Sequence, residues 1–166
     1  MFDSLKKKKS ERPVVENELG KFTLRCFENT PVNWYCGEAV WYGAEDSILA
    51  YVSCDGKRTV RADKGFAKLS ETVKNSIALD ARLREYAMDF AISKFGVNGV
   101  IAVLNDGTAG TVTYDEFAER IEVEFVEVHG NGSLSFDIWL DGMFADDSLV
   151  IGMDKDGNIT GCELQV

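Results

Sequence analysis

Apolar and polar residues alternate along several stretches of the chain, as they do in strands that bury one face. In residues 133–140 every second side chain is apolar: Leu134, Phe136, Ile138 and Leu140. Similar runs at 120–129, 149–153 and 159–166 predict three further strands. Burying one large apolar side chain stabilises a fold by roughly 1.5–3 kcal/mol. A row of such residues therefore needs a covering layer, which only the helices upstream can supply.

A first group of strands is expected nearer the N-terminus. In residues 21–28 the apolar Phe22, Leu24 and Cys26 alternate with polar residues, which predicts a strand. Residues 34–42 and 47–53 are rich in β-branched and aromatic side chains and predict two more. The turn dipeptide Asp55-Gly56 ends this N-terminal group of strands. The sequence thus predicts antiparallel meanders at both ends of the chain.

The middle of the chain has a helical period. Apolar residues recur three or four positions apart within 66–77 and again within 83–90. Their stripes are Phe66, Leu69, Val73 and Ile77 in the first helix and Leu83, Tyr86, Ala87 and Phe90 in the second. The break between the helices is placed at 75–80, with Asp80 as the N-cap of the second. Gly96 stands where a left-handed residue usually ends a helix.

Residues 96–112 fit two interpretations. Val100–Leu104 suits a short buried strand or an irregular extension of the helix, and the strand is favoured, with 107–110 as a flexible connection. Thr113 and Glu116 then form a capping box that begins a brief helix. The apolar parity changes near Phe125, which predicts a β-bulge. Glycine-containing turns at 130–132 and 154–157 predict two hairpins.

These elements predict an α+β fold, with antiparallel β-meanders before and after a central helical pair and the helices packed on the sheet. At 166 residues the chain is most simply one domain, residues 14–166, behind a disordered basic arm at 1–13. The arm carries Lys6–Lys9 after a small apolar tip. We interpret it as a solvated terminus, because a short tip with a basic run is too weak for stable membrane association.

Charge narrows the choice of partners. The chain has a net charge of −10, but residues 1–12 hold five of its 18 basic and two of its 28 acidic groups, so residues 13–166 carry −13. Such a field repels phosphates and favours a basic protein, although solubility alone also accounts for it. We therefore expect no nucleic-acid binding.

No signal-peptide core and no run of roughly 20 apolar residues is present, so a cytoplasmic location is expected. Cys26, Cys36, Cys54 and Cys162 have neither CxxC pairing nor metal-ligand spacing, and are interpreted as reduced thiols. The Asp154–Asn158 turn lacks two ligand positions of a calcium loop. We expect no metal and no cofactor.

One group of candidate functional residues is acidic. Glu122 and Glu124 stand two apart in one predicted strand, and Asp137 lies in the next. They could form a patch for a basic partner, although a solvated sheet face is the simpler interpretation and acid–base catalysis the least favoured. His129, the only histidine, lies at a strand end without a nucleophile motif.

The second group is aromatic. Trp34, Trp41 and Tyr51 crowd the N-terminal strands and could floor a ligand pocket, although packing between sheet and helices also explains them. With carboxylates or Cys36, such a pocket could serve a hydrolase. Catalytic and phosphate-loop motifs are absent from the sequence, so enzymatic activity is not favoured.

Short motifs spread over about residues 19–166 resemble the uncharacterised bacterial family DUF2262. They are Trp41 in a strand, the helix start Ala81-Arg82, Thr113 and Phe117 leading into Arg120-Ile121, the turn Asp141-Gly142-Met143-Phe144, Val150-Ile151, and Asp156-Gly157 before the last strand. Where family members often carry a Gly-His pair after the turn, this chain has Asp146-Asp147. The resemblance implies a sheet-and-helix α+β domain and transfers no activity.

The sequence thus favours a non-enzymatic, immunity-like interaction module that binds a basic partner through Glu122, Glu124 and Asp137. The alternative is a small-molecule-binding protein or hydrolase with a pocket at Trp34, Trp41 and Tyr51.

Overall fold

The computed structural model describes residues 12–165 except 27–29, 44–46, 106–107 and 145–147. An eight-stranded sheet forms the body, in the order β1-β2-β3-β4-β8-β9-β10-β11. Its strands are β1 (Val14–Asn17), β2 (Gly20–Arg25), β3 (Val32–Ala39), β4 (Ile48–Lys57), β8 (Glu122–Val128), β9 (Leu134–Trp139), β10 (Ser148–Met153) and β11 (Ile159–Gln165). Most of the arm proposed at 1–13 lies outside the described residues.

Both predicted meanders are present, but they belong to one sheet. Every neighbouring pair is antiparallel except β4 and β8, which run parallel with Tyr51 opposite Glu127. A parallel pair needs a long crossover connection. Here the helices and a small second sheet provide it, because they lie between β4 and β8 in the chain. The α+β fold class is confirmed.

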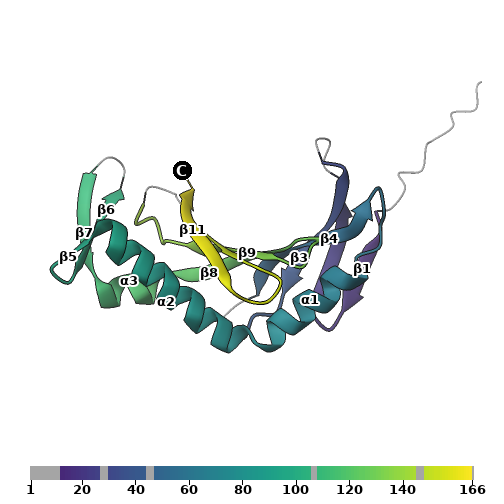
Figure 1. The fold of residues 1–166 in the computed structure, drawn as a ribbon, viewed down its shortest axis with the longest axis horizontal. Helices are drawn as coiled ribbons and strands as arrows, with labels where there is room; N and C mark the ends of the chain where they lie inside the picture. The colour runs from purple at the N-terminus through teal and green to yellow at the C-terminus, as the bar shows by residue number, and fades with distance from the viewer. Residues whose placement is uncertain (1–11, 27–29, 44–46, 106–107, 145–147, 166) are drawn as a thin grey trace, which may run out of the picture.

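Helices α1 (Asp63–Lys74) and α2 (Ser76–Phe95) follow one another along one face of the sheet (Figure 1). Their buried side chains include Leu69, Leu83 and Ala87, which join one core with the apolar face of the strands. The predicted packing of the helical pair on the sheet is confirmed. The predicted apolar stripe fails at Ile77, which is 68% exposed because it lies in the first turn after the bend between the helices.

Two predicted helix ends are wrong. Asp80 lies inside α2, which begins at Ser76. Its carboxylate is buried, where it accepts hydrogen bonds from Trp41 and Arg84 instead of capping a helix. Gly96 is extended, with φ −83° and ψ 138°, because the chain passes directly from α2 into a strand.

A three-stranded sheet lies at the far end of α2 (Figure 1). It contains β5 (Gly96–Val97), β6 (Val100–Asn105) and β7 (Thr108–Thr113). The strand predicted at 100–104 is confirmed. The flexible connection predicted at 107–110 is wrong from Thr108 onward, since β7 pairs with β6 along its length. Residue 107 lies outside the described part of the chain.

Local signals near the C-terminal strands are confirmed. Thr113 Oγ1 accepts from the Glu116 amide at 3.2 Å, and the Glu116 carboxylate accepts from the Thr113 amide at 2.8 Å, which caps α3 (Tyr114–Arg120). The register of β8 and β9 shifts between Val123 and Phe125, as expected for a bulge.

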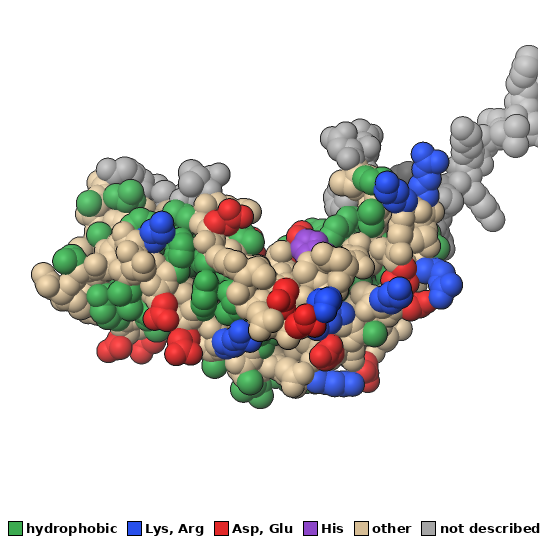
Figure 2. All heavy atoms as spheres, in the orientation of Figure 1, with side chains coloured by type: hydrophobic (Ala, Val, Ile, Leu, Met, Phe, Trp, Pro, Cys, Tyr) green, Lys and Arg blue, Asp and Glu red, His purple; other side chains and the backbone are tan. Residues whose placement is uncertain are grey.

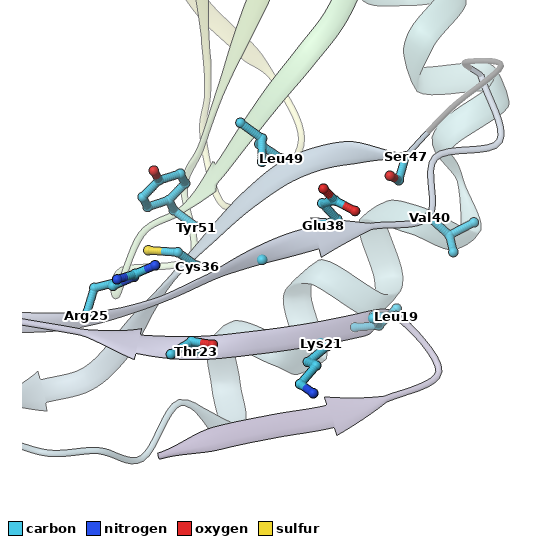
Figure 3. Close-up of a pocket in the computed structure, with 12 residues that line it drawn as sticks. Leu19, Lys21, Thr23, Arg25, Cys36, Glu38, Val40, Ser47, Leu49 and Tyr51 are labelled. Atoms are coloured by element: carbon cyan, nitrogen blue, oxygen red, sulfur yellow. The ribbon is translucent and has the colours of Figure 1, made fainter. Parts of the chain in front are cut away.

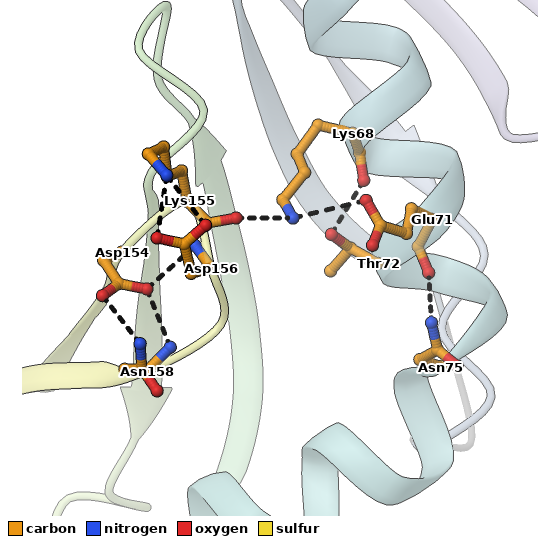
Figure 4. A network of polar contacts seen from close by, with 8 residues as sticks. All are labelled: Lys68, Glu71, Thr72, Asn75, Asp154, Lys155, Asp156 and Asn158. Atoms are coloured by element: carbon orange, nitrogen blue, oxygen red, sulfur yellow. Dashed lines mark hydrogen bonds and ion pairs between the residues drawn. The ribbon is translucent and has the colours of Figure 1, made fainter.

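The turn between β10 and β11 joins the hairpin to the helices (Figure 4). The Asp154 carboxylate accepts from the Asp156 amide and from the Asn158 amide and side chain, all within 3.0 Å. These bonds lower its pKa. Lys68 of α1 donates to the Lys155 carbonyl at 3.4 Å. The acidic residues that resemble part of a calcium loop are therefore used to close a turn.

Candidate functional site

The face of the large sheet opposite α1 and α2 carries none of the described helices (Figure 1). Side chains alternate along a strand, so residues between the buried ones point to this open face. We call this surface the saddle. Its residues are Lys21, Thr23, Arg25, Trp34, Cys36, Glu38, Leu49, Tyr51, Glu122, Phe125, Glu127, His129, Ser135, Asp137, Trp139 and Glu163. In Figure 2 the upper side of the molecule is hollowed in this view.

Strand pairing aligns the central residues of the saddle in a row across the sheet. Thr23 is opposite Cys36, which is opposite Tyr51. Across the parallel pair Tyr51 is opposite Glu127, which is opposite Ser135. Residues from both meanders therefore meet at the junction of β4 and β8, a juxtaposition that no local sequence pattern encodes.

Two pairs of aromatic rings lie at this junction of β4 and β8. The ring centroids of Tyr51 and Phe125 are 4.7 Å apart, and those of Trp34 and His129 are 5.8 Å apart, edge to face. Trp34 lies on β3 and His129 directly follows β8, and these two strands flank β4, where Ser53 is only 4% exposed. Edge-to-face and offset ring pairs of this kind stabilise their own arrangement. The floor of the saddle is thus preformed.

His129 lies within reach of two polar groups through the same ring nitrogen. Its Nε2 is 2.9 Å from Ser135 Oγ and 3.7 Å from Glu127 Oε2. A serine nucleophile needs a histidine that accepts its proton at one nitrogen while a carboxylate holds the other. Here the hydroxyl and the carboxylate compete for one nitrogen, so the arrangement suits binding better than nucleophilic catalysis.

Asp137 differs from the other carboxylates of the saddle. It lies opposite Phe125 on β8 and Val150 on β10. Its Oδ1 is buried and has no hydrogen-bond partner among the described residues. An unsatisfied buried oxygen costs about 1–3 kcal/mol. A donor from a bound partner would recover part of that cost if the side chain turned outward.

A broad open groove of about 820 Å³ lies on the saddle over β2, β3 and β4. Figure 3 shows Arg25, Cys36 and Tyr51 together at one end, with Glu38 and Ser47 toward the other. Over β2 the saddle carries Lys21 and Arg25, with Glu38 of β3 opposite Lys21. Over β8, β9 and β11 its charged residues are the carboxylates Glu122, Glu127, Asp137 and Glu163.

The candidate residues from the sequence occupy different places. Trp34 and Tyr51 lie on the saddle, whereas Trp41 is 2% exposed on the helix side, against Phe136. Trp41 is therefore no part of the groove.

Two of the acidic candidates, Glu122 and Asp137, lie on the saddle. Glu122 lies opposite Trp139 at the far end of β8, and Asp137 is two residues before Trp139 on β9. Glu124 is exposed and is the extra residue of the bulge.

Sequence reasoning did not select Phe125 or Ser135, and it interpreted His129 as an ordinary strand end. The alternating pattern of residues 120–129 places Phe125, Glu127 and His129 on one face only once the bulge is located. Their grouping with Tyr51 depends on the parallel pairing of β4 and β8. The sequence held one signal for this face: Glu127 and His129 alternate with the apolar Val126 and Val128, and so point to the opposite side of the strand.

Burial raises the pKa of three cysteine thiols. Desolvation raises the pKa of Cys36, Cys54 and Cys162 from 9.0 to about 11. At neutral pH the Cys36 thiol on the saddle is therefore protonated, which disfavours it as a nucleophile.

This shift predicts a loss of stability in alkali. A group with a higher pKa in the folded protein stabilises the fold below its unfolded pKa, and that contribution disappears as the pH rises from 9.0 to about 11. We expect the urea midpoint to fall between about pH 8 and about pH 10.5. The variant with Cys36→Ala, Cys54→Ala and Cys162→Ala should show a shallower fall. Equal slopes for the two proteins would contradict the prediction.

The described residues contain no group of three or more His, Cys, Asp or Glu side chains placed to hold a metal ion. None of the helices in the described part of the chain is long and apolar enough to cross a membrane.

Comparison with known proteins identifies one relationship. A family model described as an uncharacterised protein conserved in bacteria (DUF2262) matches residues 16–164. No curated protein and no solved structure matches the chain.

Proposed function

Because the chain belongs to the uncharacterised bacterial family DUF2262, as its motifs suggested, relatives supply no activity, and we propose a function from the saddle itself. The protein is a non-enzymatic interaction module that binds a basic segment of a partner protein on the saddle. The observation that carries this proposal is an uncovered sheet face with aromatic rings at its floor and carboxylates along β8, β9 and β11.

Aromatic and apolar exposure distinguishes this surface from an ordinary solvated sheet face. An antiparallel sheet often leaves one face in water, but that face is then mainly polar. On the saddle, Leu49 of β4 is 45% and Trp139 of β9 is 44% exposed. Phe125, whose ring lies against that of Tyr51, is on β8, the strand between β4 and β9. Clustered exposed apolar side chains typically mark a binding surface.

The chemistry of the saddle suits lysine and arginine. Aromatic faces attract cations, and carboxylates pair with them. Glu127 adjoins Tyr51, and Asp137 adjoins Phe125, so each carboxylate stands beside an aromatic ring. A basic side chain on the saddle would meet both kinds of group at once.

Reversing the charge of Glu122 and Glu124 tests the proposal. The double variant Glu122→Lys and Glu124→Lys should bind a short peptide of alternating lysine and alanine about a hundredfold more weakly, because like charges then face each other. Isothermal titration calorimetry at low salt measures the effect. The matched control is Glu85→Lys with Asp89→Lys, an equal charge change on exposed positions of α2. Equal losses in both variants would indicate a general charge effect and contradict the proposal.

A small-molecule-binding function is the second candidate, because the groove beside Tyr51 has a volume within the usual range of ligand sites. The dependence of binding on salt concentration distinguishes the two candidate functions. Binding of a basic peptide weakens as ionic strength rises, whereas binding that depends on apolar contact in the groove does not.

The proposal includes a cytoplasmic location. Cys26, Cys36, Cys54 and Cys162 are free thiols, which is typical of proteins in a reducing compartment.

A further inference from the structure

The saddle carries carboxylates over β8 and β9, and residues 6–9 of the same chain are four consecutive lysines. We propose that the lysine-rich segment at residues 1–11 binds the saddle of its own chain and competes there with a basic partner. This inference rests on the proposed function, since it assigns a second occupant to the same surface.

The segment joins the sheet at an edge strand, beside the row of saddle residues that leads to the acidic strands. Strand β1 forms one edge of the sheet, and its first residue, Val14, lies opposite Thr23. Thr23 begins the row that continues through Cys36, Tyr51 and Glu127. A segment that turned from Val14 across the open face would therefore follow this row to the acidic side of the saddle.

The reach of the segment matches the width of the sheet. Neighbouring strands are about 4.8 Å apart, which places β4 about 14 Å and β9 about 24 Å from β1. An extended chain advances about 3.4 Å per residue, so Lys9 can reach about 14 Å and Lys6 about 24 Å from Pro13. The lysines can therefore span β4 to β9, where Glu127 and Asp137 lie.

The charges of the segment agree with this placement. Leading away from Pro13, the sequence presents Arg12 and Glu11, and then Lys9 to Lys6. Leading away from β1, the saddle presents Lys21 and Arg25 on β2 and Glu38 on β3, and then the carboxylates of β8 and β9. The first strands and the residues next to Pro13 both carry mixed charges, whereas the four lysines and the carboxylates within their reach are opposite in sign.

The consequence is competition within the molecule. A tethered segment acts at an effective concentration in the millimolar range, so even weak binding would occupy much of the saddle. A basic partner would have to displace it. We expect the variant with Lys6→Ser, Lys7→Ser, Lys8→Ser and Lys9→Ser to bind the lysine–alanine peptide about tenfold more tightly than the natural chain.

Zero-length carbodiimide cross-linking of the full-length protein tests the contact directly. Mass spectrometry of the proteolysed monomer should link Lys6–Lys9 to Glu127 or Asp137. The variant Glu127→Gln with Asp137→Asn should lose these links, and Glu85→Gln with Asp89→Asn should keep them, with circular dichroism confirming that both fold. Links that favour Glu85 or Asp89, links found only in dimers, or none at all would overturn the inference.

The peptide affinities of the natural chain and the lysine-free variant distinguish a failure of this inference from a failure of the proposed function. If the lysine-free variant and the natural chain bind the peptide equally, the segment does not occupy the saddle, although the proposed function stands. If neither protein binds the peptide, the proposed function fails. Tighter binding by the lysine-free variant, together with the expected links, supports both.

Discussion

Replacing Asp80 by alanine is expected to lower the free energy of unfolding by about 3 kcal/mol, because one buried carboxylate joins three parts of the fold. Asp80 is 5% exposed. Its Oδ1 accepts from Trp41 Nε1 at 3.2 Å, and its Oδ2 accepts from Arg84 Nε at 2.7 Å. Arg84 also donates to the carbonyl of Ile121, just before β8. The network thus connects the N-terminal strands, α2 and the C-terminal strands.

Removing that carboxylate leaves two donors without their acceptor. The Trp41 indole N–H stays buried, while the Arg84 side chain is a quarter exposed and recovers some hydration. Asp80→Asn should cost less than Asp80→Ala, because an amide oxygen still accepts from Trp41. Urea unfolding monitored by tryptophan fluorescence measures both variants.

Asp89→Ala provides the matched control, since Asp89 is an exposed carboxylate on the same helix. Its effect should stay within about 0.5 kcal/mol. If Asp80→Ala proved no more harmful than Asp89→Ala, the network would not hold the two halves of the sheet together.

Asp137→Leu should have the opposite effect and raise the free energy of unfolding by about 1–2 kcal/mol. Asp137 is a half-buried carboxylate with an unpartnered Oδ1 between Phe125 and Val150. Leucine has a similar size, favours strands more than aspartate does, and adds cross-strand contacts to both neighbours. The change removes an unsatisfied oxygen and creates none.

The same variant should bind the lysine–alanine peptide more weakly, so stability and binding would move in opposite directions. Chemical unfolding and calorimetry on one preparation measure both. Glu163→Leu tests an exposed carboxylate of the same face and should leave stability nearly unchanged. A destabilised Asp137→Leu would mean that the carboxylate has a structural role, which would remove the argument that it is retained for binding.

Residues whose role depends on near neighbours were predictable from the sequence. The capping box at Thr113 and Glu116 and the bulge near Phe125 both follow from spacing within a few residues. Asp80 shows where such reasoning fails. Its position after an apparent break suggested an N-cap, but Trp41, 39 residues earlier, and Arg84 bind its carboxylate instead. A partner so distant in the chain leaves no periodic signal.

The candidate site shows the same division. Glu122 and Asp137 were selected because their spacing within and between adjacent strands was readable. Trp34, Trp41 and Tyr51 were grouped by composition alone, and the fold placed Trp41 on the opposite face from the other two. The parity of a strand residue can be counted along one strand. Its absolute side depends on what the sheet packs against.

By itself the sequence determined the class of fold, the two meanders, the helical pair and the acidic character of the body. These features depend on the spacing of apolar residues and on the number of charges, which can both be read without knowing which segments meet in space. Only the tertiary structure decided that β4 and β8 pair in parallel, which joins the meanders into one sheet and brings Tyr51 to Glu127. The physical reason is that such a pair forms after an intervening segment of some 60 residues has folded into the crossover, and its hydrogen bonds use backbone groups that every strand possesses.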